Sequence, residues 1–258
     1  MIQESKIKIL IDYILSSSNL KVEMPADETS QKRVFRAYVN MRMPKPVSKK
    51  FLQLQDEYLQ EQLLQKGITD IDCLTPVKED IFLWKGDITT LKCDAIVNAA
   101  NSQMLGCFCP NHGCIDNAIH TFAGVQLRLE CAEIMKKQGF EEPTGQAKIT
   151  RAYNLPCRYV LHTVGPIVRN TLTQQIESDL ANCYKSCLAL ADENNLQSVA
   201  FCCISTGEFC FPNEKAAEIA IKTVTDYKEK TNSKIKVVFN VFKDMDYAIY
   251  SRLLNANC

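Results

Sequence analysis

Residues 106–114 form a short segment rich in side chains that bind metal ions. Cys107 is followed after four residues by His112 and, after one more, by Cys114. Two thiolates and one imidazole are a ligand set that suits zinc. Catalytic zinc sites keep one coordination position for water or substrate, so three protein ligands predict a catalytic zinc ion. Cys109 is an alternative fourth ligand, which would close the site and make the zinc structural.

Most other cysteines and two histidines of the chain fit a buried role. The sequence has 13 cysteines, an odd number that cannot pair completely within one chain. The apolar stretch near the N-terminus is interrupted by Asp12 and lacks a cleavage site, which argues against a signal peptide. We therefore expect a cytoplasmic protein with reduced, mostly buried cysteines. His120 and His162 are interpreted as satisfied polar residues in or near the core.

Composition excludes some partners. With 258 residues and 46% hydrophobic content, the chain can bury a substantial core. No apolar run approaches the roughly 18 residues that would span a bilayer, so no membrane partner is expected. Lys and Arg number 30 and Asp and Glu number 30, which leaves no positive field to attract nucleic acid. A long polyanion such as single-stranded RNA is therefore disfavoured as a ligand, and a small nucleotide metabolite remains a third alternative.

Residues 1–75 are predicted to be a helical extension. Apolar residues recur at helical spacing over residues 6–16, and they lie on one face of a helix over residues 50–66. A loop region is expected between these two helices. Residues 41–48 contain two prolines, which are incompatible with a helix interior.

Residues 76–258 are predicted to be one α/β domain. From about residue 80, short β-branched runs alternate with longer helical stretches, which is typical of this fold class. The predicted strands are 81–84, 95–98, 147–152, 159–163, 198–204 and 236–241. The predicted helices are 114–122, 125–138, 173–194, 214–229 and 247–254. Loops at residues 86–89, 97–101 and 204–209 follow strands, where open α/β sheets bind their ligands.

These three loops, together with the segments at 145–150 and 162–166, resemble the macrodomain family over about residues 80–255. The resemblance implies a three-layer α/β/α fold with a mixed central sheet, and ADP-ribose as a ligand along the strand ends. The cysteine-rich loop stands where many macrodomain hydrolases carry a run of glycines. It is similar instead to that of the zinc-dependent macrodomains, which also have a helical N-terminal extension. This likeness implies zinc as a cofactor bound by Cys107, His112 and Cys114, with Cys109 outside the ligand set.

The family resemblance also implies roles for single residues. Asp87 would accept a hydrogen bond from the adenine amino group, with Ile88 beside the base. On spacing alone Asp87 is equally a turn or N-cap residue, but its place among the other motifs favours the ligand role. Asn101 would bind the distal ribose hydroxyls, and Asn98 would fix the loop. Asp116 resembles the aspartate proposed to position water in zinc-free relatives, with capping of the next helix as its equal alternative.

The loop after the fifth predicted strand resembles the family's diphosphate cradle. The residues of this cradle are Ser205, Thr206, Gly207, Glu208 and Phe209. Gly207 would let backbone amides approach the phosphates, and Phe209 would cover the distal ribose. A strand-to-helix turn at Gly207 and a core position for Phe209 are compatible with these roles.

The predicted function is zinc-dependent hydrolysis of the ester that links the distal ribose to an aspartate or glutamate of an ADP-ribosylated protein. Two roles for zinc stay open: it polarises an oxygen as a Lewis acid, or it lowers the pKa of a water to about 7. The resemblance further implies a lipoyl-carrier protein as substrate and a sirtuin-class ADP-ribosyltransferase as partner. The alternative function is a non-catalytic reader module that binds ADP-ribose and contains a structural zinc.

Overall fold

The computed structural model describes residues 5–16 and 23–256, and its centre is a seven-stranded mixed sheet. The strands are β2 (Pro76–Lys78), β3 (Ile81–Lys85), β5 (Ala95–Ala100), β6 (Ala147–Arg151), β7 (Tyr159–Val164), β8 (Ser198–Phe201) and β9 (Lys236–Val241). Their order is β2-β3-β9-β8-β5-β7-β6. The five inner strands run parallel to one another, and the edge strands β2 and β6 run antiparallel to their neighbours.

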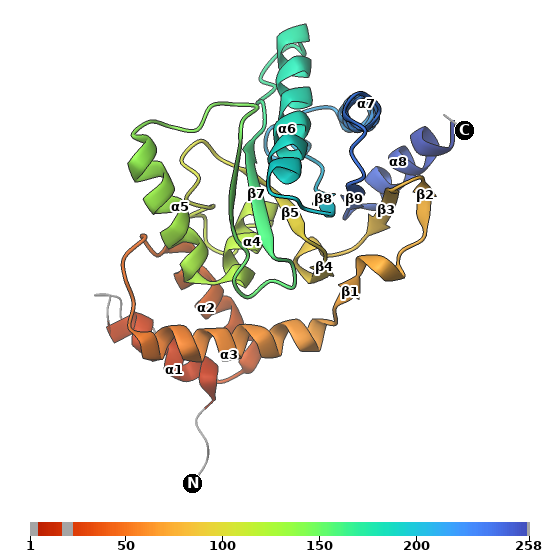
Figure 1. Cartoon of the computed structure of the whole chain (residues 1–258). Helices are drawn as coiled ribbons and strands as arrows, with labels where there is room; N and C mark the ends of the chain where they lie inside the picture. The colour runs from red at the N-terminus through yellow and green to blue at the C-terminus, as the bar shows by residue number, and fades with distance from the viewer. Residues whose placement is uncertain (1–4, 17–22, 257–258) are drawn as a thin grey trace.

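Helices cover both faces of this sheet (Figure 1). On one side lie α4 (Ile115–Ala123) and α5 (Val125–Gln138), and on the other lie α6 (Gln174–Glu193), α7 (Asn213–Thr231) and α8 (Asp244–Ala256). Parallel strands covered on both faces consist of nearly continuous apolar runs, which is why their positions could be predicted. The predicted three-layer α/β/α fold with a mixed sheet is confirmed.

The main hydrophobic core lies between the sheet and these helices. Val97, Val160, Val199 and Val237 come from four neighbouring strands, and none has exposed surface. β-branched side chains of this kind pack well on a pleated, buried surface. The core therefore fixes the strand ends that carry the loops of the site.

Three helices precede the sheet and form a second hydrophobic cluster. They are α1 (Lys6–Ser16), α2 (Glu28–Met41) and α3 (Lys49–Lys66), in red to orange in Figure 1. Leu10 and Phe51 are buried in this cluster, and Val125 of α5 belongs to it. The N-terminal helices are thus attached to the side of the sheet that α4 and α5 cover.

Helix α2 corrects the sequence prediction, because it occupies much of the region where a loop was expected. Its sequence is mostly polar, and Phe35, Tyr38 and Val39 become buried only when they pack against the neighbouring helices. Its start is fixed by the Asp27 side chain, which accepts a hydrogen bond from the Ser30 backbone N–H at 2.8 Å. The proline-containing residues 42–48 that follow it are non-helical, as predicted.

Three short strands, among them β2, were not predicted, and five strand ends differ from the prediction by one to three residues. Strand β1 (Thr69–Asp70) lies in the segment expected to be helical and pairs in parallel with β4 (Leu91–Lys92). Strand β8 ends at Phe201 rather than continuing to residue 204, because the chain turns there into the loop at 202–209. The division of the chain at residue 75 remains a prediction.

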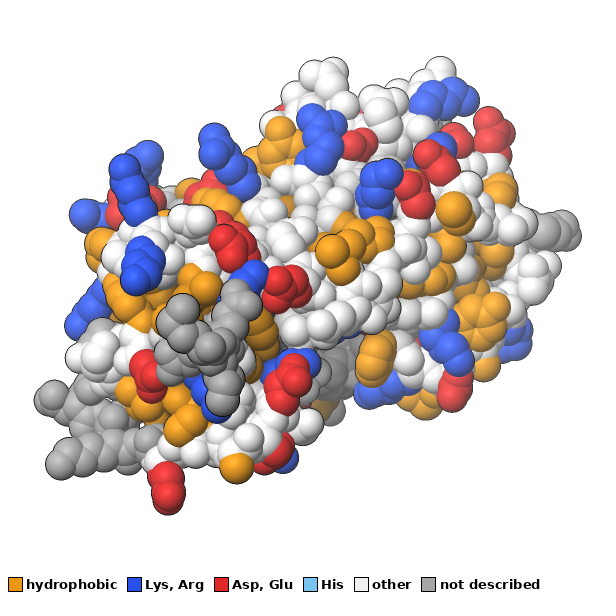
Figure 2. Space-filling model, turned by 90° about the horizontal axis from the view of Figure 1, so that it is seen from below, with side chains coloured by type: hydrophobic (Ala, Val, Ile, Leu, Met, Phe, Trp, Pro, Cys, Tyr) orange, Lys and Arg blue, Asp and Glu red, His pale blue; other side chains and the backbone are white. Residues whose placement is uncertain are grey.

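The surface of the described residues has mixed charge. Lys and Arg side chains and Asp and Glu side chains both occur across the face shown in Figure 2, which agrees with the balanced composition. Within residues 5–16 and 23–256, no helix is long and apolar enough to cross a membrane.

Candidate metal and ligand site

The three predicted ligand loops lie at one edge of the sheet. Strands β3, β5 and β8 belong to the same parallel array, so their carboxyl ends point to the same edge. The loops that follow these strands carry Asp87, Asn101 and Ser205. Because strand ends of open α/β sheets are where ligands bind, this edge is the candidate site.

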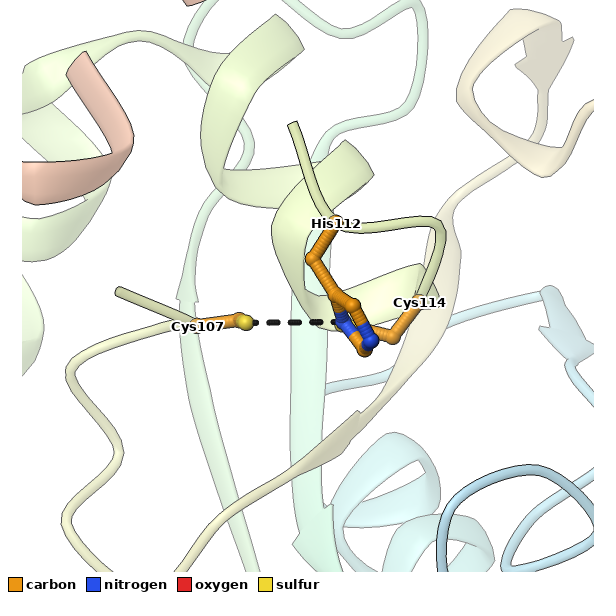
Figure 3. A group of neighbouring side chains, drawn as sticks. All are labelled: Cys107, His112 and Cys114. Carbon is orange, nitrogen blue, oxygen red and sulfur yellow. Dashed lines mark hydrogen bonds between the residues drawn. The ribbon is translucent and has the colours of Figure 1, made fainter. Parts of the chain in front are cut away.

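Cys107, His112 and Cys114 converge in the loop after β5 (Figure 3). Their ligand atoms all lie within 4.8 Å of one another, and Sγ of Cys107 lies 3.6 Å from Nδ1 of His112. Tetrahedral zinc with a Zn–S bond of about 2.3 Å and a Zn–N bond of about 2.0 Å places sulfur and nitrogen about 3.5 Å apart. The three side chains therefore fit a zinc ion without a large rearrangement.

Cys114, one of the candidate metal ligands, is the N-cap of α4. Its Sγ atom accepts a hydrogen bond from the backbone N–H of Asn117 at 3.4 Å. Burial raises the pKa of the Cys114 thiol to about 12, while the hydrogen bond from Asn117 acts in the opposite direction. Metal binding requires the thiolate, which a zinc ion and a helix N-terminus both stabilise. Cys109 is exposed and lies outside the group of three, which favours an open fourth position.

The cradle loop, residues 205–209, contacts the candidate metal loop, residues 106–114, through Glu208 and His112. Oε1 of Glu208 lies 3.5 Å from Nε2 of His112, on the opposite side of the imidazole from Cys107. A carboxylate at the second ring nitrogen fixes the tautomer and orientation of a metal-binding histidine. The Glu208 side chain is 74% exposed, so this contact is at the surface.

Asp116 is buried beside the metal loop and does not cap α4. The cap is Cys114, so the capping alternative for Asp116 is wrong. Its carboxylate accepts hydrogen bonds from Nδ2 of Asn98 at 2.8 Å and from Nδ2 of Asn101 at 3.3 Å. Burial raises the pKa of Asp116 to about 6, although the hydrogen bond from Asn98 lowers it.

Asn98 and Asn101 differ in their surroundings. Asn98 is fully buried and donates to both Asp116 and Nδ1 of His162, an arrangement suited to fixing the loop. Asn101 is half-buried, and its Nδ2 also donates to the backbone oxygen of Gly106 at 3.2 Å. Its predicted contact with a ribose hydroxyl remains a prediction.

A second group of side chains that could bind a metal lies in the core. His120, Cys131 and His162 are buried, and their ligand atoms lie within 4.8 Å of one another, so by distance they could hold a metal ion. Both ring nitrogens of His162 already have partners, because Nδ1 accepts from Asn98 at 3.2 Å and Nε2 lies 2.8 Å from Oγ1 of Thr150. Burial lowers the pKa of His162 to about 3, which keeps it neutral. The existing hydrogen bonds of His162, not its neutral state, make this group less suited to a metal than the loop is. Neither ring nitrogen of His120 has a hydrogen-bond partner among the described residues, so the prediction that His120 is a satisfied polar residue is wrong.

Asp87 has the local contacts of an N-cap residue. Its Oδ1 accepts from the backbone N–H of Thr89 at 3.0 Å at the start of a short 3-10 helix, and its Oδ2 pairs with Nζ of Lys66 at 3.0 Å. Burial alone would raise the pKa of Asp87, but the contacts with Thr89 and Lys66 lower it below its usual value. The Ile88 side chain is only 1% exposed and packs in the main core. Adenine contacts of Asp87 and Ile88 remain predictions.

The cradle loop begins at a buried residue with a positive φ, and its middle faces open space at Gly207. Ser205 is buried with a positive φ of 65°, and its Oγ has no hydrogen-bond partner among the described residues. Oγ1 of Thr206 donates to the backbone oxygen of Cys203 at 3.0 Å. A Cβ atom added at Gly207 would meet no atom within 4 Å, so space is open above the loop there. Phe209 is half-buried.

Among the residues near this site that the sequence did not identify are Phe242, Lys66 and Arg36. Phe242 follows β9 and is 76% exposed, and the pairing of Lys85 with Val241 places it beside the loop of Asp87. An aromatic residue directly after a predicted strand is a signal that could have identified it. The other two, Lys66 and Arg36, come from the N-terminal helices, and only the fold brings them to the site.

Comparison with known proteins gives consistent matches. A Macro domain model matches residues 97–220. The protein-ADP-ribose hydrolase of Treponema medium is 56% identical over 261 residues, 99% of this chain and 100% of that protein. The protein-ADP-ribose hydrolase of Staphylococcus aureus strain MSSA476 is 50% identical over 256 residues, 96% of each chain. The crystal structure of a Trypanosoma brucei macrodomain in complex with ADP-ribose has a TM-score of 0.65 at 31% identity and covers 85% of this chain and 94% of that one. The chain belongs to the macrodomain family.

Proposed function

We propose that this protein is a zinc-dependent hydrolase that removes ADP-ribose from modified proteins. The observation that carries the proposal is the convergence of Cys107, His112 and Cys114 at the edge of the sheet where the candidate ligand loops lie. The match to protein-ADP-ribose hydrolases over nearly the whole chain supports the activity. The spacing of the three ligands supports zinc, which would supply a Lewis acid or an activated water when bound.

The ligand would lie along the carboxyl ends of the strands. Asp87 and the exposed ring of Phe242 would hold the adenine, because both lie at the ends of the paired strands β3 and β9. The cradle loop at 205–209 would hold the diphosphate above the open space at Gly207. Asn101 would hold the distal ribose near the metal loop, because its amide already contacts the Gly106 backbone at the start of that loop.

Asp116 would act in this site by orienting Asn101. Its carboxylate is buried and accepts from the amide groups of both Asn98 and Asn101, so these contacts fix the direction of the Asn101 side chain. Asn101 is the more exposed of the two asparagines, which supports it as the one that would touch the sugar. Asp116 would then be needed for turnover even if it never contacts the substrate.

The proposed bond is an ester between ribose C1 and a protein aspartate or glutamate. The leaving group is a carboxylate whose acid has a pKa of about 4, so no general acid is needed to release it. Release from an aspartate-linked protein and from an arginine-linked protein should be compared at equal concentrations. Faster cleavage of the arginine linkage would contradict this assignment.

A lipoyl-carrier protein is the proposed substrate, and a sirtuin-class ADP-ribosyltransferase is the proposed partner that modifies it. This assignment is supported only by the resemblance of the loop 106–114 and of the N-terminal helices to the zinc-dependent macrodomains. Release of ADP-ribose from a modified lipoyl carrier should exceed release from an unrelated aspartate-modified protein. Equal rates on both proteins would contradict the substrate assignment and leave the linkage assignment intact.

The metal role is tested by Cys107→Ala with Cys109→Ala as a matched control on the same loop. We expect Cys107→Ala to lose zinc and to release ADP-ribose about 100-fold more slowly or worse, while it still binds free ADP-ribose. Cys109→Ala, which removes an exposed thiol outside the group of three, should keep both zinc and activity. Full release by the zinc-free variant would defeat the zinc mechanism. Binding without any turnover by the zinc-loaded parent would instead indicate a reader module.

A further inference from the structure

Helix α2 of the N-terminal extension holds the loop that carries the proposed metal ligands. Nη2 of Arg36 donates to the backbone oxygen of His112 at 3.0 Å. Oδ1 of Asn40 accepts from the backbone N–H of Asn111 at 3.0 Å. Arg36 and Asn40 are four residues apart and therefore lie on one face of α2. This face of α2 contacts Asn111 and His112, which lie between Cys107 and Cys114 in the sequence.

Arg36 also reaches the loop through Asn117. Its Nε and Nη2 atoms donate to Oδ1 of Asn117 at 3.1 and 2.8 Å. Nδ2 of Asn117, a fully buried residue, donates in turn to the backbone oxygen of Cys109 at 3.0 Å. The backbone N–H of Asn117 donates to Sγ of Cys114. One guanidinium group therefore links the middle of the loop to the residue that contacts a proposed ligand thiolate.

Helix α2 is held in place by a buried arginine of α5. Nε of Arg128 donates to the backbone oxygen of Leu105, just before the metal loop, at 2.6 Å. Nη1 of Arg128 donates to three backbone oxygens at the end of α2, those of Val39, Asn40 and Arg42. Arg128 is 5% exposed, so these contacts are shielded from water. The end of α2 and the start of the metal loop are thus bound to the same side chain.

The loop depends on such contacts for its shape. Between Ala100 and Ile115 the chain forms neither a helix nor a strand, so regular backbone hydrogen bonding does not set the spacing of the ligands. Removing the partners that orient metal ligands typically weakens metal binding about 10- to 100-fold. We infer that Arg36, together with Asn40, is a positioning residue that sets the zinc affinity of the loop, which makes the N-terminal extension part of the metal site. This inference rests on the proposed zinc ion.

The test is the zinc dissociation constant of the full chain, measured by competition with a chromophoric chelator. Arg36→Ala should weaken zinc binding about tenfold or more. Arg33→Ala removes an exposed arginine of the same helix and should leave zinc binding unchanged. Arg36→Lys keeps the charge but lacks the planar guanidinium that donates to two acceptors. Its zinc affinity should lie between that of Arg36→Ala and that of the parent. Asn40→Ala should weaken binding because the Asn111 N–H loses its acceptor.

A second readout separates positioning from a general effect on folding. Zinc that binds only the folded chain raises the melting temperature, and the rise becomes smaller as the dissociation constant increases. The rise should shrink in Arg36→Ala and stay unchanged in Arg33→Ala. If Arg36→Ala lowers the melting temperature equally with and without zinc and keeps the zinc affinity of the parent, the inference is overturned.

Two further outcomes are decisive. If Arg36→Ala does not fold, parental zinc affinity in both Arg36→Lys and Asn40→Ala overturns the inference. If the parent chain binds no zinc, the proposed function fails along with it. Zinc binding by the parent with unchanged affinity in every α2 variant refutes the positioning role alone, so the two failures are distinguishable.

Discussion

His112 lies between Cys107 and Glu208, with Nδ1 3.6 Å from Sγ of the cysteine and Nε2 3.5 Å from Oε1 of the glutamate. The ring therefore joins the metal loop to the cradle loop predicted to hold the diphosphate. A ligand that moves the cradle loop would therefore change the contact of Glu208 with His112, a proposed metal ligand. This contact relates the ligand and metal parts of the site to each other.

Replacement of Glu208 tests this relationship. Glu208→Gln should lower zinc affinity and the rate of ADP-ribose release less than about tenfold, because the contact is exposed and therefore weaker than a buried one. The difference from the parent should shrink at high salt, since exposed charges are screened. Both quantities should be measured at low and high salt, with Glu229→Gln as a control at an exposed position on α7. Equal effects of the two variants would contradict a role for the His112 contact.

Asp87→Ser separates the two roles of Asp87. Serine is a good N-cap, so the contact with the Thr89 backbone can be kept while the carboxylate is lost. We expect ADP-ribose affinity to fall about 10- to 100-fold, because a hydrogen bond to a charged group is lost, with little change in the free energy of unfolding. Affinity for ribose 5-phosphate, which lacks adenine, should not change. An equal loss for both ligands would argue against an adenine contact.

Phe242→Ala tests the aromatic residue after β9. Loss of base stacking typically costs about 1–3 kcal/mol, so ADP-ribose affinity should fall by about fivefold to 150-fold. Stability should change little, because the ring is 76% exposed. Phe140→Ala is a matched control, since that ring is 64% exposed and lies on the loop after α5. Calorimetric titration that finds parental affinity in Phe242→Ala would remove this residue from the site.

His162 predicts a pH dependence of stability. Burial lowers its pKa in the folded state to about 3, whereas the unfolded chain has a pKa of about 6.5. Between these values only the unfolded state binds the proton, so stability present above about pH 6.5 is lost as the pH falls, by about 1.4 kcal/mol per pH unit. His162→Gln should show a shallower slope in urea unfolding of the zinc-free chain.

The control for this slope is Thr150→Val, which removes the hydrogen bond to His162 but keeps the histidine. It should be less stable than the parent at every pH and retain a steep slope. Parallel stability curves for the parent and His162→Gln would show that another group causes the acid sensitivity.

The sequence alone determined features that depend on neighbouring residues. Strand β9 was predicted with its observed bounds because a covered parallel strand is a continuous apolar run. The metal ligands could be grouped because Cys107 and Cys114 lie within one short loop, where any compact conformation brings them near each other. The family resemblance placed the remaining candidate residues along the chain, although it gave no contacts between them.

The tertiary structure decided which side chains meet across long separations. Helix α2 is mostly polar in sequence and was not predicted. Its few apolar residues become buried only because the other N-terminal helices pack against them. Asp116 was predicted as a possible N-cap, but its carboxylate is buried against Asn98 and the cap of α4 is the Cys114 thiol. The contacts of His112 with Glu208 and Arg36 join segments that no local pattern relates. Only packing of the whole chain brings such residues within bonding distance, because local spacing carries no information about distant partners.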